Sequence, residues 1–380
     1  MHVLMLNYEY PPLGGGGGVA TQTLIHSLAA KGTEVTLVTS SPSTERIEEH
    51  PSQHLTIIRL PVAGRQARPV ASLSSLISYL RATIRWGKEQ QHPPFSLVHS
   101  QFAVPTGIAG QHLAQTWNLP HLVTVHGFDI HDPTRAISAD RFPPVHWVVQ
   151  RVLGSAQAVT TQSRDIARRT RQGYNLKRDL TIIPLGIPKV NIPLGPKPDT
   201  LPDGFVLVGV GRLVTRKGFD IAISALPLLP DEVKLVIIGD GPEKIDLQKL
   251  SEIKGVTSRV HFLGPTFDQE KWNVLAHAQA YVLPSLHEGF SLSTVEAMMM
   301  GLPVIASNVG GQTDYLQPGV HALLIPPSNP EALAAAVTHL MQHPELCSRM
   351  KQHNIRLANQ LTDEKMAERY QDLYAHLLHQ

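Results

Sequence analysis

Residues 2–39 read HVLMLNYEYPPLGGGGGVATQTLIHSLAAKGTEVTLVT. The stretch begins with a short apolar run, His2–Leu6, and passes through a loop of proline and glycine at 11–18. Helical spacing follows over 19–31, Gly32 ends the helix, and residues 34–39 form a second apolar run typical of a strand. A strand, a glycine loop, a helix and a strand make a βαβ unit, so we expect a parallel sheet.

The same alternation continues along the chain and restarts after a proline-rich segment. Residues 184–202 contain six prolines, a density that no regular helix or strand tolerates. Further strands are expected at 55–60, 97–99, 121–125, 158–161, 181–183, 205–210, 234–238, 260–263, 280–284 and 303–307. Helices are expected at 219–229, 269–277, 291–300, 330–342 and 363–379. The pattern predicts two doubly wound, Rossmann-like α/β domains.

The predicted domain boundaries follow from that segment. Residues 1–188 form the first domain, 189–203 the linker and 204–362 the second domain, while a last helix at about 363–380 packs back on the first domain.

Composition excludes several classes of protein. The 380 residues are 42% hydrophobic and 17% charged, which is typical of globular domains. A net charge of +2 is too small to indicate nucleic-acid binding, and the single cysteine, Cys347, excludes an internal disulfide. The chain start reads as a strand and not as a signal peptide, and no apolar run is long enough for a membrane span. We therefore expect a cytoplasmic protein.

The glycine run at 14–18 is the first candidate site. Between a strand and a helix, glycines let backbone N–H groups approach a phosphate at the positive end of the helix. A flexible turn is the alternative. A dinucleotide site would need an acidic residue at the end of the second strand, where Thr39 and Ser40 stand instead.

Two cations flank a loop in the second half of the chain. Arg212 and Lys217 stand between a predicted strand and a predicted helix, with Gly211 and Gly218 beside them. A diphosphate leaving group needs such charge where no metal assists. A solvated basic loop is the alternative.

Two glutamates and one histidine follow predicted strand ends. Glu288 lies just after the strand at 280–284, and Glu296 lies one to two turns into the next helix, so both can face the sheet edge where ligands bind. Ser293 with Glu296 also fits a capping box, a purely structural role. His126 directly follows the strand at 121–125; a buried, hydrogen-bonded histidine is the alternative there.

Taken together, these residues resemble the retaining GT-B glycosyltransferases of the glycosyl transferases group 1 family, over nearly the whole chain. The matching motifs in the second half are Gly211-Arg212-Leu213, Lys217-Gly218, Gly239-Asp240-Gly241-Pro242, Phe262-Leu263-Gly264, Pro284-Ser285, Glu288-Gly289-Phe290, Glu296-Ala297-Met298, 301–307 and Gly310-Gly311. The looser matches in the first half are the glycine loop, Val98-His99, His126-Gly127-Phe128-Asp129 and Ile183-Pro184-Leu185-Gly186. Two positions depart from the family pattern: Gln312-Thr313-Asp314 follows the paired glycines, and Leu185 stands where asparagine is usual.

The resemblance implies two domains that face each other across a cleft, with the acceptor bound by the first and the nucleotide sugar by the second. By this resemblance, the diphosphate is held by Arg212, Lys217, Gly15, Gly16, Leu292 and Ser293; the ribose by Glu296; the base by the backbone of Leu263 and Gly264; and the donor sugar by Glu288, Gly289, Phe290 and His126. Glu288 and His126 are the implied catalytic residues.

The implied reaction moves a hexosyl group from a UDP- or GDP-sugar, or another nucleoside-diphosphate sugar, to a hydroxyl of a glycan, glycolipid or small molecule, with retention of configuration. No cofactor is expected, and no metal, since the chain has no Asp-x-Asp motif. A phosphorylase-like or epimerase-like GT-B protein is the alternative among enzymes of this architecture, and nothing in the sequence supports an epimerase. Two further alternatives stay open: a non-catalytic nucleotide-sugar-binding subunit, and a dinucleotide-dependent oxidoreductase resting on Gly209-Val210-Gly211, where Val214 replaces the third motif glycine.

One helical pattern also indicates peripheral contact with the inner face of a membrane. Leu73, Leu76, Ile77, Leu80 and Ile84 have helical spacing, and Arg81, Arg85 and Lys88 lie nearby. Trp86 is expected to sit at the membrane interface. A helix that faces the protein core is the alternative.

Overall fold

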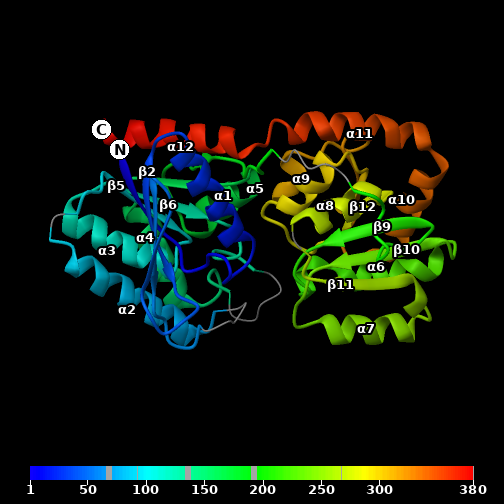
Figure 1. Ribbon diagram of the computed structural model, residues 1–380, viewed down its shortest axis with the longest axis horizontal. Coiled ribbons are helices and arrows are strands. Elements are labelled where there is room, and N and C mark those ends of the chain that lie inside the picture. Colours follow the sequence, from blue (N-terminus) through cyan, green and yellow to red (C-terminus); the bar gives the residue numbers. More distant parts are fainter. Residues whose placement is uncertain (66–70, 92, 133–137, 190–194, 267, 380) are drawn as a thin grey trace. The chain divides into compact units, whose positions relative to one another are not determined.

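The computed structural model divides the chain into two compact units. Unit 1 comprises 1–188 and 362–380, and unit 2 comprises 189–361 (Figure 1). The structure describes residues 1–65, 71–91, 93–132, 138–189, 195–266 and 268–379. Part of the expected linker, 190–194, and the last residue of the expected C-terminal helix, Gln380, lie outside the described residues.

The sheet of unit 1 is parallel except at one edge. Among the described residues its strand order is β3-β4-β2-β1-β5-β6-β7-β8. The strands are β1 (His2–Leu6), β2 (Glu34–Ser40), β3 (Ile47–Ser52), β4 (Leu55–Leu60), β5 (Leu97–Gln101), β6 (His121–Val125), β7 (Ala158–Thr161) and β8 (Thr181–Ile182). Strand β1 pairs in parallel with both β2 and β5, so the strand order reverses direction between β1 and β5.

Strand β3 was not predicted. It runs antiparallel to β4 at the edge of the sheet, and its sequence, IEEHPS, is mostly polar, with two glutamates, and mostly exposed. Charge and proline on an edge strand prevent pairing with other chains, and they also hide the strand from a search for apolar alternation.

The prediction of a loop over 11–18 was wrong at its end, because helix α1 (Gly16–Ala30) already includes three of the glycines. Packing explains why glycine stands there: a Cβ on Gly17 would lie 2.4 Å from the Phe102 ring, and one on Gly18 would lie 3.1 Å from the Glu9 carbonyl oxygen. These glycines let the first turn of the helix closely approach the segments that follow β1 and β5.

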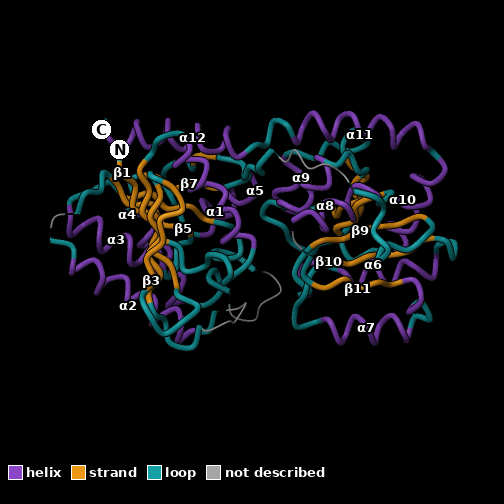
Figure 2. The backbone as a smooth tube through the Cα atoms, in the orientation of Figure 1, coloured by secondary structure: helices purple, strands orange, loops and turns teal. Residues whose placement is uncertain are grey.

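The other helices of unit 1 are α2 (Leu73–Glu89), α3 (Thr106–Trp117), α4 (Pro143–Ser155), α5 (Arg164–Gly173) and α12 (Asp363–Leu378). Helix α12 packs against α1, α2 against α3, and α3 against α4. Figure 2 shows the strands of each unit gathered into one sheet with helices outside it.

The chain leaves and re-enters unit 1 at neighbouring points. Asp363 donates its backbone N–H to the carbonyl of Ile187 at 3.1 Å. A Cβ on Gly186 would lie 2.2 Å from the carbonyl oxygen of Thr362. The glycine of the Pro-Leu-Gly motif is therefore required by the returning chain.

Unit 2 has a smaller parallel sheet. Among the described residues its strand order is β11-β10-β9-β12-β13-β14, so the direction reverses between β9 and β12. The strands are β9 (Phe205–Val210), β10 (Val233–Ile238), β11 (Val260–Gly264), β12 (Ala280–Leu283), β13 (Val304–Ser307) and β14 (Ala322–Ile325). The helices are α6 (Phe219–Ala225), α7 (Lys244–Ile253), α8 (Asp268–His277), α9 (Leu292–Met299), α10 (Pro330–Gln342) and α11 (Pro344–Ala358).

Each unit is a doubly wound α/β domain, which confirms the predicted fold class. Within the described part of the chain, no helix combines the length and the apolarity needed to cross a bilayer.

Candidate active site

The candidate groups of unit 2 gather at the carboxyl ends of its strands. Arg212 follows β9, Gly264 ends β11, and Glu288 lies in the segment between β12 and α9. Strands β9 and β12 are neighbours at the point where the strand order reverses, which is where open α/β sheets bind ligands. The topology therefore brings the two cations and Glu288 to one edge.

Lys217 and Glu288 form a buried ion pair. The Lys217 ammonium lies 2.6 Å from Glu288 Oε2, and the two side chains are 11% and 6% exposed. Ser285 donates a longer hydrogen bond, 3.4 Å, to the same oxygen. A buried carboxylate needs such a partner to stay charged away from water.

The paired glycines of the family motif hold the backbone of Glu288. Gly311 donates its N–H to the Glu288 carbonyl at 2.8 Å. Gly310 has φ +63, and a Cβ there would lie 2.0 Å from the same carbonyl oxygen. Glycine is thus required at 310, while Asp314 ends a 3-10 turn that begins there.

Arg212 differs from Lys217. Its side chain is half-buried, and it makes no ion pair or side-chain hydrogen bond with the rest of the described chain. The backbone of the same loop is fixed, because Leu286 donates its N–H to the Arg216 carbonyl at 2.8 Å. A guanidinium that has no ionic partner and stands on a loop with a fixed backbone suits an anionic ligand.

The capping box proposed for Ser293 and Glu296 is wrong. Helix α9 begins at Leu292, and Ser291 is the N-cap, accepting a hydrogen bond from the N–H of Thr294. Ser293 instead donates to the Val210 carbonyl at 3.1 Å and accepts from the Tyr281 hydroxyl at 2.8 Å. It ties the start of α9 to the carboxyl end of β9.

Glu296 has a partner that sequence reasoning missed. Lys271, on α8, places its ammonium 2.7 Å from Glu296 Oε1. The two residues are 25 positions apart, and only the packing of α8 beside α9 brings them together.

The other two groups of positions in unit 2 lie near strand ends. Gly264 has a carbonyl that accepts from the Gly239 N–H at 2.8 Å, and both Leu263 and Gly264 are half-buried. Gly289 is buried, and the Phe290 ring packs 4.9 Å from that of Tyr315, measured between centroids.

In unit 1, a protein carboxylate occupies the glycine loop. Glu9 accepts a hydrogen bond from the Gly15 N–H at 3.2 Å. A Cβ on Gly16 would meet nothing within 4 Å. The backbone at Gly16 is open, whereas the Gly15 amide, which was expected to meet a phosphate, already has an acceptor.

His126 is buried, and both of its ring nitrogens have partners. Its Nε2 lies 2.8 Å from Gln101 Oε1, and its Nδ1 lies 2.8 Å from the amide nitrogen of Gln162. This network assigns the proton to Nε2. Burial lowers the pKa of His126 to about 3, so the ring is neutral at pH 7.

The polar chain continues from His126 to the C-terminal helix. The Gln101 amide nitrogen lies 3.1 Å from His99 Nε2, and His99 Nδ1 lies 2.7 Å from the hydroxyl of Tyr374 on α12. Sequence reasoning missed Gln101 and Gln162, since nothing in their local pattern marks them.

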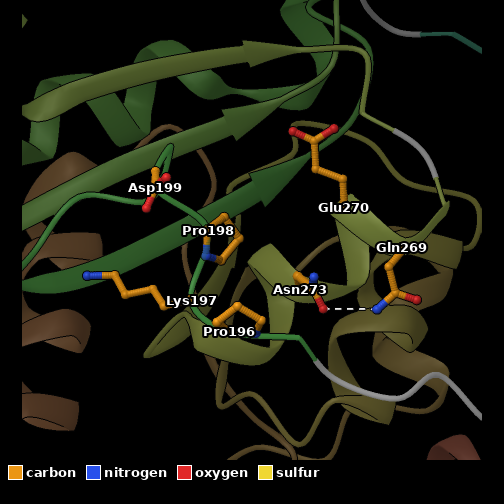
Figure 3. A pocket seen from close by; sticks show the side chains of 7 residues that line it. All are labelled: Pro196, Lys197, Pro198, Asp199, Gln269, Glu270 and Asn273. Carbon is orange, nitrogen blue, oxygen red and sulfur yellow. Dashed lines mark hydrogen bonds between the residues drawn. The ribbon is translucent and has the colours of Figure 1, made fainter.

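A cavity of about 430 Å³ lies elsewhere in unit 2 (Figure 3). It is lined by Pro196, Lys197, Pro198, Asp199, Gln269, Glu270 and Asn273. None of these is a predicted site residue, and Gln269 donates to Asn273 across its wall at 3.1 Å.

Two family descriptions match this chain. The description "Glycosyl transferases group 1" matches residues 196–356, and "Glycosyl transferase 4-like domain" matches residues 15–186. Together they span both units.

Curated relatives and solved structures agree with these matches. The chain is 28% identical to the glycogen synthase of Mycobacterium tuberculosis, covering 92% of this chain and 88% of that one. It is 27% identical to the D-inositol 3-phosphate glycosyltransferase of Paenarthrobacter aurescens, covering 87% and 86%. The sucrose-phosphate synthase of Thermosynechococcus elongatus superposes with a TM-score of 0.85 at 25% identity, covering 99% of both chains. The Anabaena protein HepE, solved in complex with UDP-glucose, gives 0.77 at 18% identity, covering 99% and 100%.

Proposed function

We propose, from the premise that this chain belongs to the glycosyl transferases group 1 family of retaining, nucleotide-sugar-dependent GT-B glycosyltransferases, that unit 2 binds the donor and unit 1 the acceptor. The observation that carries this division is the cationic loop at the strand-order reversal of unit 2. There Arg212 has no ionic partner in the described chain, and Lys217 is held beside Glu288.

Arg212 and Lys217 hold the donor diphosphate in this proposal. The N-terminus of α9, at Leu292 and Ser293, adds backbone N–H groups and partial positive charge at the same edge. Gly16 offers a similarly open backbone in unit 1.

The remaining contacts with the donor are assigned to other residues at or near the carboxyl edge of the same sheet. Glu296 holds the ribose, and the backbone of Leu263 and Gly264 meets the base. Glu288 contacts the sugar, with Gly289 and Phe290 beside it. His126 of unit 1 is assigned to the donor sugar by the family resemblance, with a sugar hydroxyl taking the place of one of its glutamine partners, Gln101 or Gln162.

The chemistry that these groups support is attack on the face from which the diphosphate leaves. The bond from the anomeric carbon to the diphosphate oxygen breaks, the bond to the acceptor oxygen forms, and the departing phosphate takes the acceptor's proton. Arg212 and Lys217 stabilise the negative charge that develops on the diphosphate. Glu288 stabilises the positive charge that develops on the sugar ring.

The donor that we propose is a UDP-hexose. HepE, which has the same fold, was solved with UDP-glucose, and the family members above are named for glycosyl transfer to polysaccharide or to phosphorylated small molecules. The acceptor is a hydroxyl of a carbohydrate, of a lipid-linked glycan or of a small molecule.

A panel of nucleotide sugars tests this function. Donor hydrolysis and thermal stabilisation are measured for UDP-glucose, UDP-N-acetylglucosamine and GDP-mannose; a bound nucleotide raises the melting temperature by mass action. Proton NMR of the first product then identifies its anomer. An α-linked donor that gives a β-linked product contradicts the mechanism, and the absence of turnover with tight nucleotide binding favours a non-catalytic subunit.

We also propose that unit 1 contacts the inner face of the membrane through α2. Leu73 is 74% exposed and Ile77, one turn later, is 43% exposed. Arg81 and Arg85 continue along the helix and are exposed. Apolar side chains followed by basic ones suit an anionic lipid surface. Trp86 is only 2% exposed, so the expectation that it anchors at the interface was wrong.

Vesicle flotation at low salt tests this contact. The protein is expected to float with anionic vesicles and not with neutral ones. The double variant Leu73→Gln/Ile77→Gln is expected to stay at the bottom of the gradient. Ile253→Gln in unit 2 removes a side chain that is 80% exposed and serves as the matched control. Equal flotation of wild type and the double variant contradicts the proposal.

A further inference from the structure

Lys271 is fixed in place by two groups of unit 2. Its ammonium lies 2.7 Å from Glu296 Oε1, and the two side chains are 18% and 17% exposed. The same ammonium lies 4.8 Å from the centroid of the Trp272 ring, which is buried. A carboxylate and an aromatic face together restrict a side chain that is otherwise flexible.

The contact leaves half of the carboxylate open. Lys271 occupies Oε1, and within the described residues Oε2 of Glu296 has no hydrogen-bond partner. An ammonium has three N–H donors, of which the contact with Glu296 uses one. The pair therefore offers an open acceptor beside open donors.

A ribose presents two adjacent hydroxyls. A lone carboxylate only accepts hydrogen bonds, whereas each hydroxyl both donates and accepts. We propose that Lys271 is a specificity-determining residue for the donor: Glu296 Oε2 accepts from one ribose hydroxyl while the Lys271 ammonium donates to the oxygen of the other. This proposal rests on the assignment of Glu296 to the ribose.

Charge supports the same assignment. An unpaired Glu296 would repel the diphosphate of the donor, and Lys271 neutralises it, as Lys217 neutralises Glu288 nearby. The pair can thus hydrogen-bond the ribose of the nucleotide without repelling its phosphates.

The test compares a ribonucleotide with its 2′-deoxy and 3′-deoxy counterparts. Calorimetry measures the affinities of UDP, 2′-deoxy-UDP and 3′-deoxy-UDP for wild type, Lys271→Met, Lys271→Gln and Glu296→Gln. Methionine keeps the apolar stem over Trp272 and removes only the charge and the donors. Lys249→Met, which changes an exposed lysine of α7, is the matched control.

Wild type and Lys249→Met are expected to prefer UDP over each deoxy counterpart by about tenfold or more, the value of one good hydrogen bond to a charged group. Both Lys271 variants are expected to reduce one of these two preferences to about threefold or less, mainly by weakening UDP, and Glu296→Gln is expected to reduce the other. Retention of both preferences in both Lys271 variants overturns the role of Lys271. Retention of both preferences in Glu296→Gln instead overturns the assignment of Glu296, and with it this part of the proposed function.

Discussion

The ammonium of Lys217 lies 2.6 Å from Glu288 Oε2, and both side chains are buried. Arg212 and Lys217, the two cations proposed to hold the diphosphate, are therefore not equivalent. Lys217 is already paired within the protein, while Arg212 has no ionic partner in the described chain. Substitutions at the two positions are expected to separate binding from stability.

Arg212→Ala is expected to weaken binding of a nucleoside diphosphate and to leave the fold unchanged. A charge-assisted hydrogen bond is worth roughly 1.5–3 kcal/mol, or about tenfold to a hundredfold in affinity. Calorimetry with UDP and with uridine distinguishes the phosphate contact from the rest, because uridine is expected to bind normally. Unchanged UDP affinity means that the guanidinium does not meet the diphosphate.

Lys217→Ala is expected to weaken the same binding and also to destabilise unit 2. Removal of the ammonium leaves a buried Glu288 carboxylate unpaired, which costs about 3–5 kcal/mol in comparable pairs. Thermal unfolding of the two variants side by side is the measurement. Equal melting temperatures for Arg212→Ala and Lys217→Ala would show that the ion pair adds nothing to stability.

Glu288→Gln is expected to lower kcat by several orders of magnitude while UDP affinity stays the same or rises a few-fold. The amide keeps the shape of the side chain but cannot stabilise positive charge on the sugar, and Lys217 is released toward the diphosphate. Turnover of UDP-glucose and calorimetry with UDP provide the two values. A rise in KM alone, with kcat intact, would assign Glu288 to binding.

Turnover is expected to persist in excess chelator. In the proposed mechanism, Arg212 and Lys217 supply the positive charge that a metal gives in other transferases. The rate in chelator is compared with the rate after added magnesium or manganese. Complete loss followed by recovery with metal contradicts this expectation.

Unit 1 is expected to lose stability between pH 7.5 and 5. Burial lowers the pKa of His121 and of His126 to about 3, against 6.5 in the unfolded chain. Stability is full above 6.5 and falls as the pH drops, because the unfolded state takes up the protons. At pH 5, each of the two histidines lowers the free energy of unfolding by about 2 kcal/mol. Burial raises the pKa of Asp129 to about 6, which offsets this loss by about 1 kcal/mol.

His121→Gln isolates one of these contributions. His121 Nε2 contacts the Ser100 hydroxyl at 2.9 Å, and its Nδ1 is buried without a partner. Chemical unfolding is measured at pH 7.5 and at pH 5. Between these values His121→Gln is expected to lose about 2 kcal/mol less unfolding free energy than wild type does. The exposed control, His112→Gln, is expected to lose as much as wild type. An identical loss in His121→Gln excludes this histidine as a cause.

Much of the fold could be predicted because its signals are local. The apolar run of β1, the strand at Ala158–Thr161 and the helix at Pro330–Gln342 have the predicted bounds. Strand β3 was not predicted because this polar edge strand lacks the alternation of apolar and polar residues. The start of α1 was not predicted because glycine normally disfavours a helix; the close contacts with Phe102 and with the Glu9 carbonyl explain the glycines there.

The partners of the candidate residues could not be predicted. Lys217 and Glu288 are 71 positions apart, and His99 and Tyr374 are 275 apart, so packing alone decides these pairs. Motifs name chemically suitable residues, but they carry no information on which neighbour holds each side chain.

The return of α12 to unit 1 also sets an order of assembly during synthesis. The buried hydroxyl of Tyr374, on the last helix, contacts His99 in the middle of the sheet of unit 1. Residues 189–361, which form unit 2, leave the ribosome before that helix does. Unit 1 is thus completed only after unit 2 has been synthesised, and a chain that stopped before α12 would carry a finished unit 2 and an incomplete unit 1.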